Sequence, residues 1–297
     1  HSSQGEQDSR RYAKFARTPC IEPSDSQEAK DMVAAAFELS ERFDTPVLLR
    51  LTTRIAHSDS IVELGPDRDL AMQRGKPSYR IDAGKYVMVP ANARKRHVVM
   101  EERVQRIAAF ANDFTYNRME LGDRSLGIVT CGVAYQYAKE VFPNASFLRL
   151  GMTYPVPAQQ ITAFAQQVER LIVIEEGDPV IEEEIKLLGI ACEGKSIFPL
   201  CDEFSPQVVR QSAIAAGLLD SAARLERPKL KLPALPPRPP VLCPGCPHRG
   251  VFTITRKLKM VVNGDIGCYT LGFLPPLSAL HSCGCMGASI GVAHGVN

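Results

Sequence analysis

Apolar residues recur along the chain at two spacings, which predict helices alternating with short buried strands. In the first block, Pro23 followed by Ser24 or Ser26 can begin a helix. Its apolar positions lie at helical spacing: Met32, Val33, Ala36, Phe37 and Leu39. A turn containing Pro46 ends the helix, and residues 47–51 (VLLRL) predict a short buried strand. Helix, turn and strand make half of a parallel α/β unit.

The next block, residues 57–125, is punctuated by Pro and Gly, which predicts irregular structure over much of its length. Residues 98–121 predict one amphipathic helix with charges opposite an apolar side. That side holds Val104, Ile107, Ala108 and Phe110. The basic run 94–96 precedes the helix, and we expect it to be a solvated surface, with a phosphate contact as the alternative.

From about residue 125 the pattern becomes a regular alternation of strand and helix. The segments that carry it are 125–142, 145–157, 158–177 and 178–190. They predict a parallel sheet with right-handed crossover helices, so the expected fold class is α/β. Glu175 and Glu176 follow a predicted strand, at the end where α/β proteins place ligands. We expect a solvated turn there, with ligand contact as the alternative.

Composition narrows the class of protein. Apolar residues make up 45% of the chain and charged residues 23%, the balance of a globular protein. The net charge of +2 and the absence of Trp give no general case for a nucleic-acid or membrane partner. No apolar run has the roughly 18 residues that a membrane span needs. Six prolines between Pro228 and Pro240 predict an extended linker.

The nine cysteines are an odd number and are unevenly spread, with five of them between Cys243 and Cys285. The chain begins at His1 without a signal-like segment, and we interpret it as a fragment of a longer polypeptide. We therefore expect a cytoplasmic protein with reduced thiols. In that compartment clustered cysteines indicate metal, cluster or catalytic chemistry.

The stretch VLCPGCPHRG, residues 241–250, carries a CxxC pair, Cys243 and Cys246. A zinc site matches poorly because no second CxxC follows. A thioredoxin-like dithiol also matches poorly, because a Pro-rich linker precedes the pair and Pro247 follows it. The third interpretation is an iron–sulfur cluster held by these two thiolates, Cys268 and a further ligand.

Two glycine-rich turns surround the later cysteines. GDIGCYTLG follows the apolar residues 260–262, which predict a short strand that ends there. Its glycines let backbone amides approach an anion closely: Gly264, Gly267 and Gly272. GCMGASIGVAHG predicts a turn that opens a helix, whose N-terminus would favour phosphate. Tight turns with close helix packing are the alternative.

The motifs RPPVLCPGCPHRG, GDIGCYTLG, LPPLSAL and CMGASIG, in this order, resemble the large-subunit family of indolepyruvate:ferredoxin oxidoreductase. This family is one of the thiamine-diphosphate-dependent 2-oxoacid:ferredoxin oxidoreductases. HSSQGEQDSRRYAKFA, EPSDSQEAKDMVAAAFELSERFDTPVLLRLTTR and TCGVAYQYAKE resemble it too, so the resemblance covers nearly the whole chain.

The resemblance implies four regions. Residues 1–120 would be the later part of the aminopyrimidine-binding domain with an extension, and residues 125–225 a transketolase C-terminal-like domain. Residues 226–240 would be the Pro-rich linker, and residues 241–297 the truncated start of the thiamine-diphosphate-binding domain.

The implied activity is oxidative decarboxylation of aryl pyruvates such as indolepyruvate. Coenzyme A would take the acyl group and ferredoxin the electrons, with a small (beta) subunit as partner. The implied cofactors are thiamine diphosphate, Mg²⁺ and [4Fe–4S] clusters, of which the family's C-terminal clusters lie outside this chain. We expect the fragment alone to be inactive. The alternative is a non-catalytic subunit-docking module with a zinc-stabilised Cys-rich loop.

The resemblance also implies site residues. Arg10, as a candidate for the substrate carboxylate, and His248 would be catalytic. The cofactor would be held by Cys246, His248, Gly264, Asp265, Gly267, Cys268, Leu271, Gly272, Met286 and Gly287. The thiolates of Cys243, Cys246 and Cys268 are the candidate metal ligands. No residue of this chain is assigned to Mg²⁺.

Overall fold

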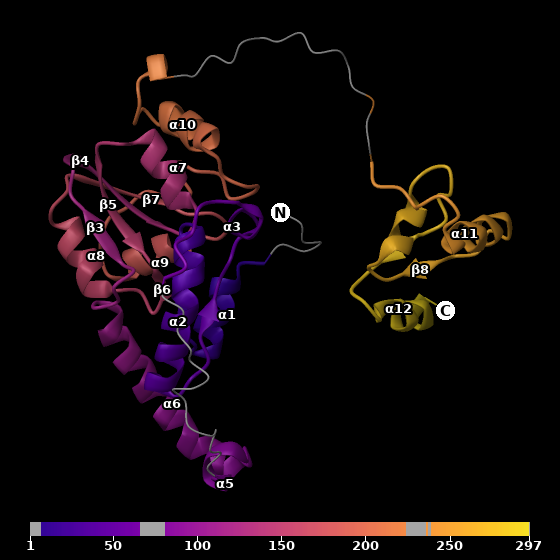
Figure 1. Ribbon diagram of the computed structural model, residues 1–297, viewed down its shortest axis with the longest axis horizontal. Coiled ribbons are helices and arrows are strands. Elements are labelled where there is room, and N and C mark those ends of the chain that lie inside the picture. The colour runs from indigo at the N-terminus through magenta and orange to yellow at the C-terminus, as the bar shows by residue number, and fades with distance from the viewer. Residues whose placement is uncertain (1–6, 66–80, 224–235, 237–238, 297) are drawn as a thin grey trace. The chain divides into compact units, whose positions relative to one another are not determined.

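The computed structural model describes residues 7–65, 81–223, 236 and 239–296 of the 297-residue chain. The chain divides into two compact units, of which the first ends at Glu226 and the second begins at Arg227 (Figure 1). The second unit thus begins inside the predicted linker, most of which lies outside the described residues.

A four-stranded sheet with the strand order β3-β5-β4-β7 forms the centre of the first unit. β4 (Asp123–Cys131), β5 (Ala145–Leu150) and β7 (Arg170–Ile174) run parallel. The short β3 (Arg118–Glu120) pairs antiparallel with the outer edge of β5. All six residues of β5 are buried, including Ser146 and Arg149, and Arg149 forms a buried ion pair with Glu28 at 2.5 Å.

Helices cover both faces of this sheet. α7 (Ala134–Val141) and α10 (Pro206–Ala215) pack on the face that carries Ile128. α8 (Ala158–Ala165) and α9 (Val180–Leu187) pack on the face that carries Val129. The alternation of strand and helix predicted from residue 125 onward is therefore confirmed, and the fold class is α/β.

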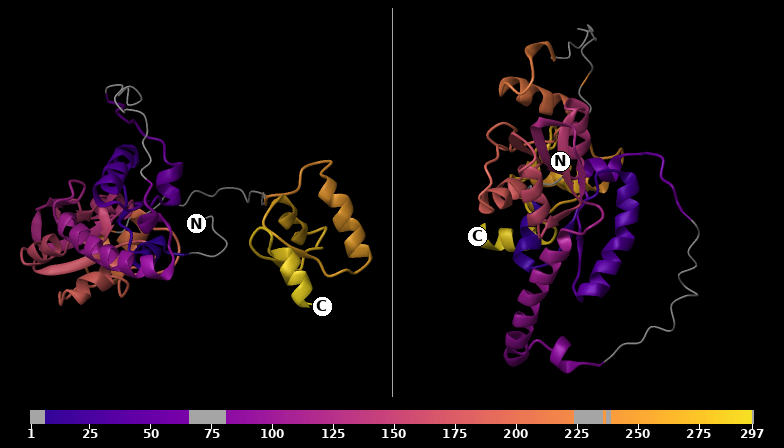
Figure 2. Two further views of the ribbon diagram at one scale, coloured as in Figure 1. Left: turned by 90° about the horizontal axis from the view of Figure 1, so that it is seen from below. Right: turned by 90° about the vertical axis from the view of Figure 1, so that its left-hand side faces the viewer.

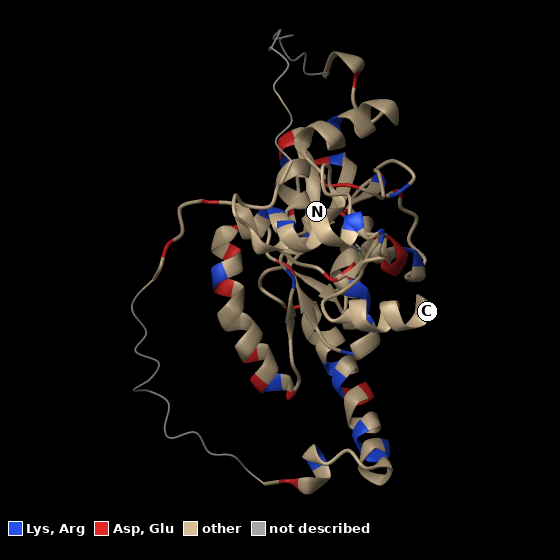
Figure 3. Cartoon of the chain, turned by 90° about the vertical axis from the view of Figure 1, so that its right-hand side faces the viewer, with Lys and Arg blue, Asp and Glu red and all other residues tan. Residues whose placement is uncertain are grey.

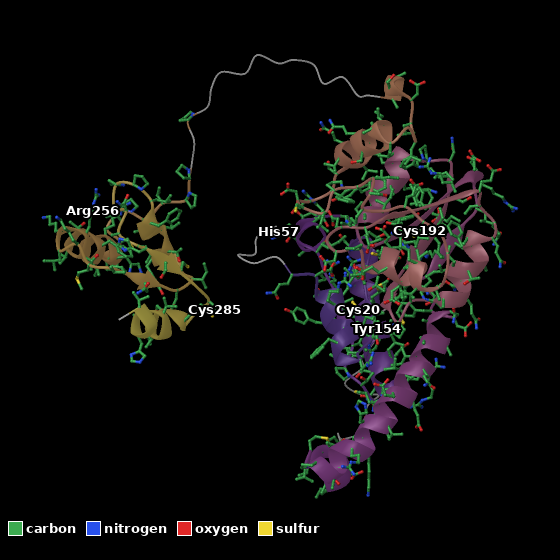
Figure 4. The ribbon with its side chains drawn as sticks, turned by 180° about the vertical axis from the view of Figure 1, so that it is seen from behind. Cys20, His57, Tyr154, Cys192, Arg256 and Cys285 are labelled. Carbon is green, nitrogen blue, oxygen red and sulfur yellow. The ribbon has the colours of Figure 1, made fainter. Side chains whose placement is uncertain are left out.

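A second, smaller sheet joins the N-terminal and middle regions, with the strand order β2-β1-β6. Its strands are β1 (Cys20–Ile21), β2 (Leu48–Leu49) and β6 (Met152–Tyr154). β1 pairs parallel with β2 and antiparallel with β6, so Cys20 lies opposite Tyr154 (Figure 4). Residues from 1–120 and from 125–225 thus contribute to one sheet.

The helices of the N-terminal region are α1 (Ser9–Ala16), α2 (Ser26–Phe43) and α3 (Thr53–His57). Asp25 caps α2 by accepting a hydrogen bond from the Glu28 N–H at 2.8 Å, and α2 ends where Asp44 adopts a left-handed conformation. Met32 and Leu39 are buried as the spacing predicts, but Val33 and Phe37 are 43% and 64% exposed. Only part of the predicted apolar face therefore lies in the core.

α6 (Pro90–Ala111) extends away from the two sheets and carries α5 (Ala83–Tyr86) at its far end (Figure 2). The predicted helix over 98–121 was placed too late, because Pro90 begins the helix and residues 118–120 form β3. The basic run lies within its first turns, among the Lys and Arg residues visible along its outer part (Figure 3). Arg96 forms an ion pair with Asp44 at 3.5 Å. The irregular stretch predicted before it lies partly at 66–80, outside the described residues.

The second unit is small. Its elements are α11 (Pro247–Lys257), β8 (Asn263–Gly264), η2 (Cys268–Phe273), β9 (Ser282–Cys283) and α12 (Ala288–Val296). Leu242, Phe252 and Ala279 form its buried core. The strand expected at 260–262 was placed too early, since the parallel β8–β9 pair begins at Asn263. Across the described residues no helix combines the length and apolarity needed to cross a membrane.

Candidate functional site

The first candidate site lies where parallel strands of both sheets end. Glu22 follows β1, Arg50 follows β2, Cys131 ends β4 and Glu175 follows β7. All four side chains contact or face the guanidinium of Arg10, which enters from α1. Arg10 has no exposed surface, so residues far apart in the sequence make one buried charged cluster.

Every N–H group of the Arg10 side chain has an acceptor within the protein. Nε donates to Asp8 Oδ1 at 2.9 Å, and Nη1 donates to Glu175 Oε2 at 2.6 Å and to Cys131 Sγ at 3.5 Å. Nη2 donates to Asp8 Oδ2 and to the carbonyl oxygens of Glu176 and Asp178, at 2.5, 2.8 and 3.0 Å. The geometry makes Arg10 an anchor for the α1 segment. Its implied role toward a substrate carboxylate stays a prediction.

The charges of the cluster set the protonation of its carboxyl groups. Burial alone would raise the pKa of Asp8, but the hydrogen bonds and charge of Arg10, together with the charge of Arg50, lower it to about 2. Burial raises the pKa of Glu175, although Arg10 and the N–H groups of Glu182 and Ile181 oppose that shift. Asp8 therefore stays ionised and forms a buried ion pair with Arg10.

The expectation of a solvated turn at Glu175 and Glu176 was wrong. Glu175 is 1% exposed and accepts hydrogen bonds from the N–H groups of Ile181 and Glu182 at 3.0 Å. Glu176 accepts a hydrogen bond from the Phe204 N–H at 2.7 Å. These carboxylates accept hydrogen bonds from N–H groups at the start of α9 and in the loop before α10. The alternative of ligand contact stays a prediction.

Sequence reasoning missed Arg50. Its Nη1 donates to Glu22 Oε2 at 2.7 Å and its Nε to Ser9 Oγ at 3.2 Å. The available signal was a charged residue that interrupts the apolar run VLLRL directly at a strand end.

The second candidate site is the glycine-rich turn of the second unit. Asp265 accepts hydrogen bonds from the N–H groups of Gly287 at 3.0 Å and Ser289 at 2.5 Å, so it caps the start of α12. The structure thus brings GDIGCYTLG and CMGASIG together, and the prediction that the latter opens a helix is confirmed. Gly267, Cys268, Met286 and Gly287 are exposed at this turn.

The CPGCPHRG motif reaches the same turn through His248. The imidazole packs on the Tyr269 ring with centroids 5.7 Å apart, and the Tyr269 hydroxyl accepts a hydrogen bond from the Asp265 N–H at 2.8 Å. Cys246 and Leu271 pack against the core of the unit. Pro247 does not prevent a helix after Cys246, because it occupies the first turn of α11, where a backbone N–H has no partner within the helix. A helix thus begins directly after Cys246, so Pro247 does not count against a thioredoxin-like dithiol.

Two of the predicted cofactor glycines have a packing reason to lack a side chain. A Cβ on Gly264 would lie 2.5 Å from Leu280 Cδ1, and one on Gly272 would lie 2.4 Å from the Phe252 ring. Gly267 differs, because a Cβ there would meet the Tyr269 ring only at 3.4 Å, an ordinary contact. Packing therefore gives no reason for a glycine at position 267, whose N–H donates to Thr270 Oγ1 at 3.1 Å.

The structure does not bring the candidate metal ligands together. Cys243 and Cys268 are exposed and Cys246 is half-buried. Within the described ranges no three His, Cys, Asp or Glu side chains form a group that could hold a metal ion. An iron–sulfur cluster at Cys243, Cys246 and Cys268 stays a prediction.

The two sites define an α/β protein with a buried charged cluster at its strand ends and a glycine-rich turn in its second unit. Along its whole length the chain is similar to proteins named indolepyruvate oxidoreductase subunit IorA. It is 38% identical to that of Archaeoglobus fulgidus over 316 residues and 39% identical to that of Thermococcus kodakarensis over 317 residues. Six such relatives are 36–39% identical, which confirms the resemblance.

The chain spans about half the length of the curated relatives it matches, 50% of the Archaeoglobus fulgidus protein and 49% of the Thermococcus kodakarensis protein. No family model matches the chain.

Among solved structures, a 2-oxoglutarate:ferredoxin oxidoreductase from Magnetococcus marinus is similar with a TM-score of 0.46 and 15% identity. The similarity covers 67% of this chain and 42% of that one. A split-gene transketolase is similar with a TM-score of 0.35 and 14% identity, over 67% of this chain and 56% of that one.

Proposed function

We propose that this chain is part of the large subunit of an oxidoreductase that oxidatively decarboxylates aryl pyruvates such as indolepyruvate. Coenzyme A would receive the acyl group, ferredoxin the electrons, and a small subunit would complete the enzyme. The observation that carries the proposal is the similarity of 99–100% of the chain to six proteins named indolepyruvate oxidoreductase subunit IorA.

The glycine-rich turn of the second unit supports a place for thiamine diphosphate. Thiamine diphosphate supplies an electron sink for the carbanion left by decarboxylation. The exposed glycines at positions 267 and 287 would face its diphosphate. Their N–H groups now donate to Thr270 Oγ1 and Asp265 Oδ2, so the diphosphate would bind by replacing these acceptors. His248 and Asp265 lie at the same turn, through Tyr269, and would orient the bound group.

We also propose roles for the regions of the chain and sites for the other cofactors. Residues 1–120 would complete the aminopyrimidine side, residues 125–225 the transketolase C-terminal-like domain, and residues 241–297 the start of the diphosphate side. Mg²⁺ would be bound by residues that are not assigned in this chain. One cluster would be held by Cys243, Cys246 and Cys268, and the family's C-terminal clusters would lie outside this chain. A cytoplasmic location is consistent with nine cysteines among which the described structure forms no disulfide.

Cofactor binding by the complete polypeptide tests the proposal. Calorimetric titration with thiamine diphosphate and Mg²⁺ should show saturable binding to the wild-type protein. Gly267→Ala adds a methyl group where the diphosphate would approach, without a clash in the fold. We expect it to weaken binding by roughly tenfold, about 1.4 kcal/mol.

Gly250→Ala is the matched control, because a Cβ at this exposed position of α11 meets no atom within 4 Å. It should bind thiamine diphosphate like the wild-type protein. Absence of binding to the wild-type polypeptide, or equal binding by Gly267→Ala, contradicts the proposed site.

A further inference from the structure

The connections of the four-stranded sheet diverge between β4 and β7. β4 leads through α7 to β5 on one side, whereas β7 leads through α9 to Glu193, which pairs with β7 on its other side. α7 and α9 also cover opposite faces of the sheet. Open α/β sheets bind ligands in the crevice that such a divergence leaves at the carboxyl ends of the strands.

In this protein the Arg10 guanidinium fills that crevice. It lies between Cys131 at the end of β4 and Glu175 at the end of β7, at 3.5 and 2.6 Å. The space left beside it, lined also by Glu22, Arg50 and Thr52, has a volume of about 10 Å³, enough for a single water molecule. Glu22 Oε1 is buried there without a hydrogen-bond partner.

We propose that the crevice between β4 and β7 is a guanidinium-binding site whose resident ligand is Arg10, and that the filled site positions the Asp8–Arg11 segment. The carboxylates of Asp8, Glu22 and Glu175 form its anionic walls, and the carbonyl groups of Glu176 and Asp178 complete it. The acceptors lie around a planar fork with five N–H donors, which a guanidinium offers and an ammonium does not.

The other ion pairs of α1 are weaker than this anchor. Arg11 pairs with Asp178 and Glu183, and Lys14 with Glu184, but these side chains are largely half-exposed, and such pairs contribute little. Arg10 and its partner Asp8 are almost fully buried. Asp8 caps α1 through the Arg10 N–H and also accepts from the Asp178 N–H at 3.1 Å. The position of residues 8–11 therefore depends on the filled crevice.

The test is chemical rescue of Arg10→Ala in the complete polypeptide assembled with its small subunit. Removing Arg10 leaves buried carboxylates unpaired, so we expect the melting temperature to fall by about 10 °C. Millimolar guanidinium chloride, far below denaturing concentrations, should recover most of that loss because the free ion refills the crevice. If guanidinium does not raise the melting temperature of Arg10→Ala, the proposed guanidinium-binding site is contradicted.

Arg170→Ala is the matched control, since Arg170 forms a half-exposed pair with Glu193 at 2.7 Å. Its melting temperature should stay close to that of the wild-type protein and should not respond to guanidinium. An equal response of both variants also overturns the site, because it would reflect a general effect of the ion.

The claim that the filled crevice positions residues 8–11 for catalysis rests on the proposed function and is tested by a separate measurement. In Arg10→Ala we expect the KM for the aryl pyruvate to rise by about fivefold or more, with a smaller change in kcat, and guanidinium to restore it. Recovery of the melting temperature without recovery of KM overturns the positioning role. The melting measurement needs no activity, so it stands apart from a failure of the proposed function.

Arg10→Lys provides a second variant if Arg10→Ala does not fold. It keeps the charge and most of the volume but loses the fork, so it should fold with a lowered melting temperature and a raised KM. A lysine variant that matches the wild-type protein in both measurements contradicts a guanidinium-specific site.

Discussion

At the scale of single residues, the chemistry of the first unit depends on burial. Asp8 is held ionised by Arg10 and Arg50, whereas buried thiols beside the same cluster are held protonated. Burial, followed by the charge of Glu22, raises the pKa of Cys20 to about 12. Cys20 is therefore a structural thiol and not a nucleophile.

The raised pKa of Cys20 predicts a loss of stability in alkali. The unfolded thiol loses its proton near pH 9.0, while the folded thiol keeps it to about pH 12. The unfolded state is therefore favoured as pH rises between these values. Between about pH 8 and pH 10 the wild-type protein should lose about 1 kcal/mol more stability than Cys20→Ala. Urea unfolding at both pH values measures this difference.

The exposed Cys201 provides the control for this experiment. Cys201→Ala should lose as much stability between the two pH values as the wild-type protein does. If Cys20→Ala also loses that full amount, the thiol of Cys20 is not the group that titrates.

No sequence pattern predicts the partners of Arg10. Glu175 lies 165 residues away and Cys131 lies 121 residues away, so only the pairing of strands brings them to Arg10. The sequence did place Glu175 at a strand end, which is where the cluster forms. Whether the Glu175 carboxylate is solvated depends on the packing of α1 over it. The sequence near Glu175 does not indicate that packing.

At the scale of elements, the sequence predicted best where strands are long and apolar. β4, β5 and β7 are runs of buried residues between clear turns, so their periodicity is strong. β1 and β2 have two residues each and depend on pairing with each other and with the distant β6. Such strands carry too few residues for a pattern. The buried strand predicted over 47–51 is shorter in the structure and only half-buried.

In the second unit, the cap of α12 is an element-scale feature that can be tested. Asp265→Ala removes the acceptor of the Gly287 and Ser289 N–H groups, so both amides should exchange with solvent faster by roughly fivefold. Hydrogen exchange measured by mass spectrometry on peptides covering 285–296 follows this change.

Asp265→Asn keeps a capping oxygen and should exchange nearly as slowly as the wild-type protein. Equal exchange in Asp265→Ala and the wild-type protein would show that another group holds the start of α12.

At the scale of the whole molecule, the chain has two compact units and corresponds to about half of its relatives. The two candidate sites belong to different units: the Arg10 cluster to the first and the turn at Gly267 to the second. The motifs of the second unit were found from sequence because they are local and rich in glycine. Their convergence through Asp265, Tyr269 and His248 required the structure.

The most direct test of the proposed function uses the complete polypeptide with its small subunit. Ferredoxin reduction is followed with indolepyruvate, coenzyme A and thiamine diphosphate, and each component is then left out in turn. The proposal predicts reduction with release of CO₂ and formation of an acyl-CoA, and none of these without thiamine diphosphate. Reduction that proceeds fully without thiamine diphosphate, or its absence with every aryl pyruvate, would contradict it.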